Sequence, residues 1–164
     1  TLQLDEFFPY KVVEEILSEF DQRIREKKLQ VRIYFENQDF CVLADKVLMK
    51  QAISNVIHNA LRYSNEGELV EIVLKKDKLS VKNYGVAIAE EDLEKIFEPF
   101  YCVDKSRSKK LGGSGLGLAI TREIIEEHGF SIIARSQENR HEKIFTEFVI
   151  CFGGGKDERV DTKS

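Results

Sequence analysis

The chain has 164 residues, 42% of them apolar and 33% charged, with a net charge of −4 at pH 7. This length and apolar fraction predict one globular domain over residues 1–152 and a polar, disordered tail over residues 153–164. The mild negative charge argues against nucleic acid or an anionic membrane as the main partner. No apolar run approaches a membrane span, and the three cysteines lack the spacing of a zinc site, so free thiols are expected.

The apolar pattern predicts helices and strands in an irregular alternation. A first amphipathic helix follows Pro9 and ends near Lys28, and strands are expected over residues 29–35 and 40–43. Asp45 is placed to cap a helix over residues 45–63. Next come strands over residues 70–74 and 79–83, a short helix over residues 90–96, a polar loop over residues 102–113 and a helix over residues 116–127 that ends at Gly129.

Two further strands, over residues 131–136 and 143–152, complete the expected fold. The order of elements predicts an α+β fold, a two-layer α/β sandwich. Its mixed sheet would have about five strands, with three main helices packed on one face.

The helix predicted over residues 45–63 carries an unusual polar stripe. Asn55, Asn59, Arg62 and Tyr63 lie at i, i+4, i+7 and i+8, so they share one helix face. Asparagine is a poor helix former and a plain solvated face is normally rich in Lys and Glu, so two asparagines indicate a function. Amide oxygens suit Mg²⁺, arginine suits phosphate, and a tyrosine ring can cover a base.

Two glycine-containing turns add to this stripe. Asn83 ends a strand whose same-side neighbours are apolar, so it either contacts a base such as adenine or caps the turn into Gly85. Residues 113–118 read Gly-Ser-Gly-Leu-Gly-Leu and open a helix, where backbone N–H groups favour a phosphate. The preceding loop contains Lys105 and Arg107, and it is expected to close over a triphosphate as a mobile lid.

Taken together, these motifs resemble the ATP-binding catalytic domain of bacterial sensor histidine kinases. The superfamily also holds the nucleotide domains of gyrase, Hsp90 and MutL. Residues 55–60 stand as the asparagine box, 83–88 as the first glycine box, 97–101 as the phenylalanine box and 113–118 as the second glycine box. The resemblance covers nearly the whole chain and implies a Bergerat-type ATP-binding fold with a mobile ATP lid.

The resemblance implies a Mg²⁺–ATP site. Asn59 would coordinate Mg²⁺, Asn55 would support it, and Arg62 would reach phosphate, with Lys105 and Arg107 contributing from the lid. The phosphates would be cradled by the backbone of the second glycine box, at Gly113, Gly115, Leu116, Gly117 and Leu118.

The resemblance also implies an adenine pocket. Tyr63 and Ile88 would sandwich the base, Asn83 would bind its amine, and Thr146 would share a water contact with Asn83. The remaining positions of the implied ATP site are Gly85, Ala87, Phe100 and Tyr101.

The implied activity is transfer of the γ-phosphoryl group to a histidine on a separate dimerisation domain, which then passes it to a response regulator. None of the three histidines stands in an acceptor motif. Full-length relatives imply a cytoplasmic domain of a cell-membrane sensor, monomeric in isolation and homodimeric in the whole protein.

Three positions depart from the family pattern. Asn83 stands where aspartate is usual, Ala87 where glycine is common, and Cys102 where arginine is frequent. A degenerate nucleotide- or partner-binding module is therefore one alternative. An ATPase or serine kinase of the same superfamily is another, although residues 49–61 contain no acid to activate water.

Overall fold

The computed structural model describes residues 1–85, 87–101, 117–139 and 142–153. The expected lid, all of the second glycine box before Gly117 and the expected tail after Gly153 lie outside the described residues, whereas Gly153 itself is described and buried. Within the described part, no helix combines the length and the apolar character needed to cross a bilayer.

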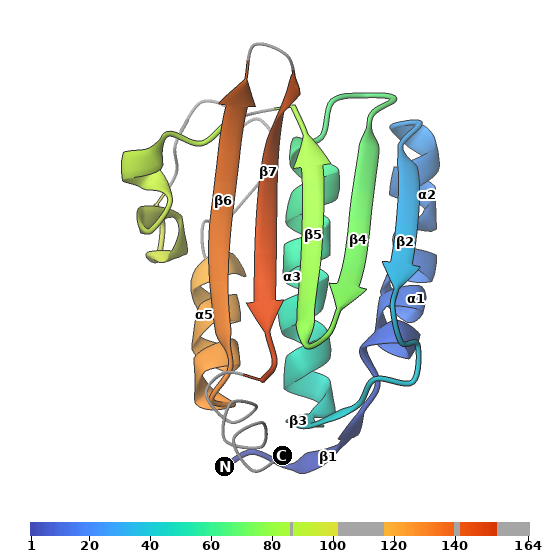
Figure 1. The fold of residues 1–164 in the computed structure, drawn as a ribbon, viewed down its shortest axis with the longest axis vertical. Coiled ribbons are helices and arrows are strands. Elements are labelled where there is room, and N and C mark those ends of the chain that lie inside the picture. Colours follow the sequence, from blue (N-terminus) through green and yellow to red (C-terminus); the bar gives the residue numbers. More distant parts are fainter. Residues whose placement is uncertain (86, 102–116, 140–141, 154–164) are drawn as a thin grey trace.

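A mixed sheet of five strands forms one layer of the molecule (Figure 1). Its order is β2-β4-β5-β7-β6, in which β2 runs parallel to β4 and the other neighbours are antiparallel. The strands are β2 (Gln30–Phe35), β4 (Leu69–Lys75), β5 (Lys78–Tyr84), β6 (Ser131–Asn139) and β7 (Glu142–Cys151). Apolar residues alternate along β4 and β5 and are buried on the side that faces the helices.

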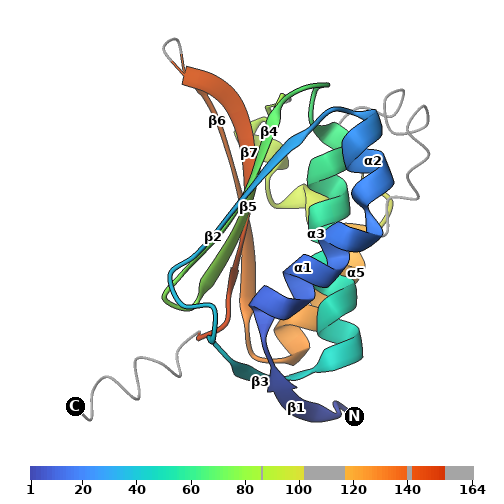
Figure 2. The same ribbon diagram turned by 90° about the vertical axis from the view of Figure 1, so that its right-hand side faces the viewer.

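Helices cover only one face of this sheet (Figure 2). They are α1 (Pro9–Glu19), α2 (Asp21–Glu26), α3 (Lys46–Tyr63) and α5 (Gly117–Glu127). Asp45 caps α3 as predicted, since its carboxylate accepts a hydrogen bond from the Leu48 N–H at 3.1 Å. The two-layer α+β sandwich predicted from the sequence is therefore confirmed.

The first predicted helix is wrong in one respect, because it is broken into α1 and α2. Phe20 leaves the helical conformation between them, and its ring stacks on His58 of α3 with centroids 5.4 Å apart. The apolar periodicity continues through the break, so the sequence pattern hides it. Packing of one aromatic residue on another element interrupts the helix.

Two other expectations need correction. The helix expected over residues 90–96 is two short 3₁₀ turns, η1 (Glu90–Asp92) and η2 (Lys95–Phe97), and the second is held by Phe97 packing edge-on against Phe148. The strand expected over residues 40–43 is β3 (Val42–Asp45), which pairs antiparallel with β1 (Leu4–Phe7). The sequence analysis missed β1, a strand that has only one buried residue.

Candidate functional site

A row of polar side chains crosses three neighbouring strands at the end of the sheet where β5 finishes. Asn83 of β5 pairs with Thr146 of β7, which pairs with Ser136 of β6. Asn83 and Thr146 are only 2% and 4% exposed, because both face the helices. The buried position of Asn83 confirms the prediction from the alternation along β5.

The side-chain amide of Asn83 is unusual for a buried polar group. Within the described part of the chain, its side chain makes no hydrogen bond to another residue. Such a group costs about 1–3 kcal/mol when left unsatisfied. A buried donor and acceptor in this state are suited to a ligand that offers the complementary acceptor and donor.

The turn after β5 brings α3 and the polar row together. Gly85 has φ +147° and forms an isolated bridge with Ser64, directly after α3. A Cβ at Gly85 would lie 3.2 Å from the Tyr63 carbonyl oxygen, a tight contact, and the positive φ would strain any other residue, so glycine is favoured at this close approach. Tyr63, predicted as one side of a base pocket, therefore lies at the same end as the polar row.

Ile88, predicted as the other side of that pocket, is tied to the row by its backbone. Its N–H donates to the Ser136 hydroxyl at 2.8 Å, and that hydroxyl donates to the Phe145 carbonyl at 3.0 Å. Ala87 precedes it and is half-buried. The structure thus brings the backbone of the first glycine box onto β6, through a serine that the sequence analysis did not single out.

The polar face of α3 points toward α5. The Asn55 amide donates to the Gly117 carbonyl at 3.2 Å, and Asn59 lies one turn further along. Asn59 is half-buried, and its side chain makes no hydrogen bond within the described ranges. The Arg62 guanidinium carbon lies 5.7 Å from the centre of the Tyr63 ring. Of the predicted stripe, the structure thus ties Asn55 to the first residue of α5 and places Arg62 over the Tyr63 ring.

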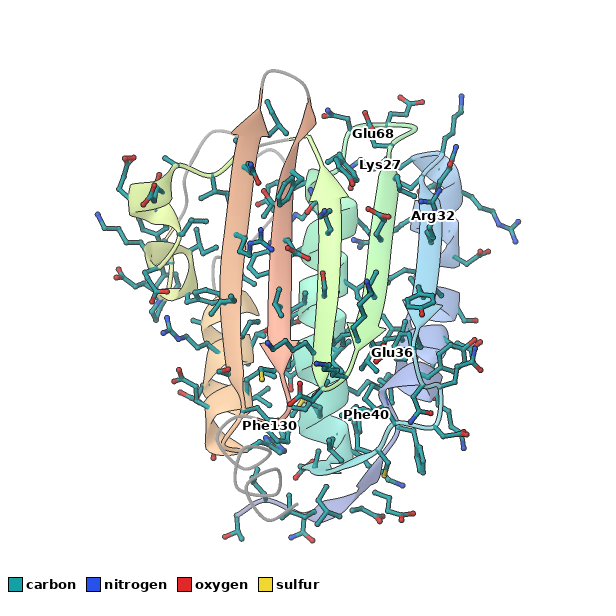
Figure 3. The ribbon with its side chains drawn as sticks, viewed as in Figure 1. Lys27, Arg32, Glu36, Phe40, Glu68 and Phe130 are labelled. Atoms are coloured by element: carbon teal, nitrogen blue, oxygen red, sulfur yellow. The ribbon has the colours of Figure 1, made fainter. Side chains whose placement is uncertain are left out.

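The charge next to this stripe is positive. Burial lowers the pKa of His58, and the nearby charges of Arg23 and Arg62 lower it further. Arg23 donates to the imidazole Nε2, so the ring is a neutral acceptor in this arrangement. Lys27, at the upper end in Figure 3, donates to the carbonyls of Leu61 and Arg62 at 2.8 and 2.6 Å. Cations thus gather around the last turns of α3, where the negative end of the helix dipole favours them.

Phe100 and Tyr101, the aromatic pair of the phenylalanine box, make their contacts away from the polar row. Phe100 is 71% exposed and has a positive φ of 64°, whereas Tyr101 packs partly against the core. The Tyr101 hydroxyl donates to Asp92, which raises the pKa of Tyr101 to about 12. Of the other predicted positions, Leu118 is half-buried on α5, while Cys102, Lys105, Arg107, Gly113, Gly115 and Leu116 lie outside the described residues.

Two residues that sequence reasoning missed complete the site. Ser136 is the polar member of an inward-facing series on β6, and Thr121 is the polar member of the buried face of α5. Each is a polar residue at a position where the period predicts an apolar one. That signal led to Asn83 and could have led to these two as well.

Comparison with known proteins decides the family. Residues 44–152 match the family described as histidine kinase-, DNA gyrase B- and HSP90-like ATPase. The chain belongs to this family. The catalytic domain of the histidine kinase ThkA shares the fold with a TM-score of 0.73 and 31% identity, over 92% of this chain and 96% of that domain.

Relatives within this ATPase family include whole sensor kinases. Sensor histidine kinase WalK of Bacillus subtilis is 42% identical over 110 residues, which are 63% of this chain and 18% of WalK. Sensor protein kinase WalK of Staphylococcus aureus is 43% identical over 103 residues, 59% of this chain and 25% of that protein. A structure of ThkA in complex with the response regulator protein TrrA also matches, with a TM-score of 0.71, 31% identity and coverage of 90% and 41%. The chain thus spans a quarter or less of these two WalK proteins.

Proposed function

We propose that this chain is the ATP-binding catalytic domain of a sensor histidine kinase. It binds Mg²⁺–ATP and donates the γ-phosphoryl group to a histidine on a separate dimerisation and phosphoacceptor domain. The observation that carries the proposal is the amide of Asn83, which is buried and has no hydrogen-bond partner among the described residues, within a member of this ATPase family.

The adenine ring fits the polar row chemically. Its exocyclic amine donates and its ring nitrogens accept, and an asparagine amide offers the matching acceptor and donor. A base bound there would satisfy Asn83, and the Thr146 hydroxyl beside it would add a contact through water. In this proposal Tyr63 and Ile88 supply the apolar surfaces that flank the ring.

The phosphates and the metal would lie along the polar face of α3. The Asn59 amide oxygen is a neutral, hard ligand, and Mg²⁺ commonly combines one or two protein oxygens with phosphate oxygens and water. Arg62 would neutralise phosphate charge, helped by Lys105 and Arg107. The backbone N–H groups of residues 113–118 would complete the phosphate cradle.

Transfer of the phosphoryl group asks little covalent chemistry of this domain. In-line geometry and neutralisation of the oxygen charges dominate such reactions, and these are what the proposed residues supply. The nucleophilic histidine would come from the acceptor domain. By analogy with ThkA and TrrA, a response regulator would then receive the phosphate. The whole protein would be a homodimeric membrane sensor with this domain on the cytoplasmic side, and the isolated domain would be a monomer.

Hydrolysis by this domain alone is a weaker candidate. A hydrolytic member of the superfamily would use an acid on the asparagine-bearing helix to activate water, and α3 contains neither Asp nor Glu. In the proposal, water is therefore not the acceptor.

Calorimetric titration with a non-hydrolysable ATP analogue, with and without Mg²⁺, tests the proposal directly. The expected result is micromolar-to-millimolar binding that weakens without Mg²⁺ and in Asn59→Ala. Gln51→Ala is the matched control, because Gln51 is an exposed amide on the same helix. Absence of binding by the wild-type chain would favour a degenerate partner-binding module. Steady release of inorganic phosphate from ATP in the absence of an acceptor domain would favour an ATPase.

A further inference from the structure

The carbonyl oxygen of Gly117 receives two side-chain hydrogen bonds. The Thr121 hydroxyl donates to it at 2.8 Å from one turn further along α5, and the Asn55 amide donates at 3.2 Å from α3. Thr121 is fully buried. A hydroxyl that bonds back to the carbonyl four residues earlier is common in helices, but here a second helix bonds to the same atom.

The two hydrogen bonds do not meet at Gly117 because a larger residue would be too crowded there. A Cβ on Gly117 would lie 4.0 Å from the Asn55 Cγ, which is an ordinary contact distance. The carbonyl is therefore the point of attachment between α3 and the first turn of α5. Both donors use an N–H or O–H group, and the oxygen offers two lone pairs to receive them.

We propose that Thr121 is a positioning residue that, together with Asn55, fixes the first turn of α5 for phosphate binding. This inference rests on the proposed nucleotide site. Gly117 is the first residue of α5 and the fifth of the six residues that would cradle phosphate. The Gly117 carbonyl and the Leu118 N–H share one peptide plane, so fixing the carbonyl fixes the direction of that N–H, and a backbone donor acts on an anion only when it is correctly aimed.

The inference separates two parts of the ligand. Thr121 acts on the phosphate turn, whereas the polar row of Asn83, Thr146 and Ser136 belongs to β5, β7 and β6. Removing the Thr121 hydroxyl should therefore weaken a triphosphate and leave adenosine, which has no phosphate, as it was.

The test compares Thr121→Val, which keeps the shape and removes the hydroxyl, with Thr121→Ser, which keeps the hydroxyl. Calorimetry would measure binding of a non-hydrolysable ATP analogue with Mg²⁺ and of adenosine, and a thermal melt would follow stability. Loss of one neutral hydrogen bond predicts analogue binding about 3- to 10-fold weaker in Thr121→Val, with near wild-type binding in Thr121→Ser. Adenosine should bind both variants as it binds the wild type.

A double-mutant cycle sharpens the result. If Thr121 and Asn55 act through one carbonyl, the double variant Thr121→Val with Asn55→Ala should lose less affinity than the product of the fold-losses of its two single variants. The double variant Thr121→Val with Asn83→Ala should lose affinity by the full product of the fold-losses of its own two single variants. Equal losses for adenosine and the analogue, or no loss for either, would overturn the positioning role alone. A wild-type chain that binds neither ligand would overturn the proposed function as well.

Discussion

The lower end of the ribbon in Figure 1, around β3 and the start of α3, differs from the upper end, where β5 finishes, in how its buried polar side chains are paired among the described residues. Asp45 accepts from the Leu48 N–H and, at 3.0 Å, from the Gln3 N–H. Its own N–H donates to His128 Nε2 at 3.0 Å, and His128 donates to the Ile124 carbonyl at 2.8 Å. These bonds join the residue before β1, the start of α3 and the end of α5 into one network. Among the described residues, the Asn83 side chain at the upper end has no such network.

Aromatic packing adds to the stability of the lower end. Phe40 and Phe130 both lie at the lower end (Figure 3), and their ring centres are 5.9 and 5.3 Å from that of Phe152. Such contacts stabilise the fold. The difference between the ends indicates a division of work, in which the lower end supplies stability and the upper end keeps hydrogen-bonding capacity for a nucleotide.

Among the substitutions considered, Asn83→Leu should have the largest effect on nucleotide binding at the upper end. Its buried amide would be replaced by an apolar side chain of similar size, so analogue affinity should fall by at least tenfold, about 1.4 kcal/mol. Stability should stay level or rise, because an unsatisfied polar group is removed. Calorimetry and a urea unfolding curve measure the two quantities.

Gln51→Leu is the control for Asn83→Leu, since it makes the same change at an exposed position on α3. It should leave affinity unchanged. If Asn83→Leu instead lost stability by several kcal/mol while keeping its affinity, Asn83 would be a structural residue and the contrast between the two ends would be wrong.

Gly85→Ala should damage both fold and site. Alanine is strained at φ +147°, and its Cβ would press on the Tyr63 carbonyl at 3.2 Å and the Asn65 side chain at 3.3 Å. Backbone strain of this kind is worth about 1–3 kcal/mol of stability. Displacement of Tyr63 should also weaken the ATP analogue.

Gly67→Ala is the matched control for the Gly85 substitution. Gly67 has φ +80° and a Cβ there would meet nothing within 4 Å, so strain remains but contact does not. Its stability should fall by about 1 kcal/mol while affinity stays at the wild-type value. Calorimetry would measure the affinity of both variants for the ATP analogue. Equal losses in Gly85→Ala and Gly67→Ala would argue that Tyr63 plays no part in binding.

The lower end was partly predictable from the sequence and the upper end less so. The sequence predicted Asp45 as a helix cap, because capping is a local interaction over three residues. Its bond to His128 joins residues 83 positions apart, and no local pattern encodes it. At the upper end, alternation predicted that Asn83 is buried, while the tether from Ile88 to Ser136 depends on a register that only the assembled sheet determines.

The resemblance found the family because its motifs are contiguous stretches of sequence. The same reasoning missed Thr121, whose partner Gly117 lies inside a motif but whose importance depends on Asn55 from another helix. It also missed the break at Phe20, which is caused by packing on His58. The contributions of Lys105, Arg107 and residues 113–116 stay predictions.

Asp45→Ala tests the lower end, where a substitution should change stability and leave binding as it is. Losing the cap and the bond from Gln3 should lower Tm by about 5 °C, while analogue affinity per folded molecule stays unchanged. Asp5→Ala is the control, because Asp5 is an exposed carboxylate on β1 beside the same network. A large affinity loss in Asp45→Ala would mean that the lower end also controls the site.

The Asp45 network also predicts an acid dependence. Hydrogen bonds from Gln3 and Leu48 hold the pKa of Asp45 below its ordinary value. The folded state therefore binds this proton less readily than the unfolded chain, so its contribution is present above about pH 4 and is lost as pH falls through the folded pKa. Tm measured from pH 5 downward should fall less steeply in Asp45→Ala than in the wild type.

His58 should give the smallest effect, a pH dependence at the edge of the site. Burial, Arg23 and Arg62 lower its pKa, so the folded state resists protonation more than the unfolded chain does. Stability is then complete above the ordinary histidine pKa of about 6.5 and declines as pH falls below it. A urea midpoint at pH 5.5 should lie below that at pH 7.5, and His58→Phe should narrow the difference.

Arg23→Gln tests the electrostatic part of this shift, because it removes one of the two positive charges. The pKa of His58, followed by NMR titration of its ring protons, should rise toward the ordinary value. Arg25→Gln is the control, since Arg25 lies on the same helix but pairs with Asp21 at 2.8 Å. If both variants raise the pKa equally, long-range charge rather than the Arg23 contact sets it. If neither does, burial alone is responsible, and the positive edge of the site has no measurable influence on a neighbouring ionisable group.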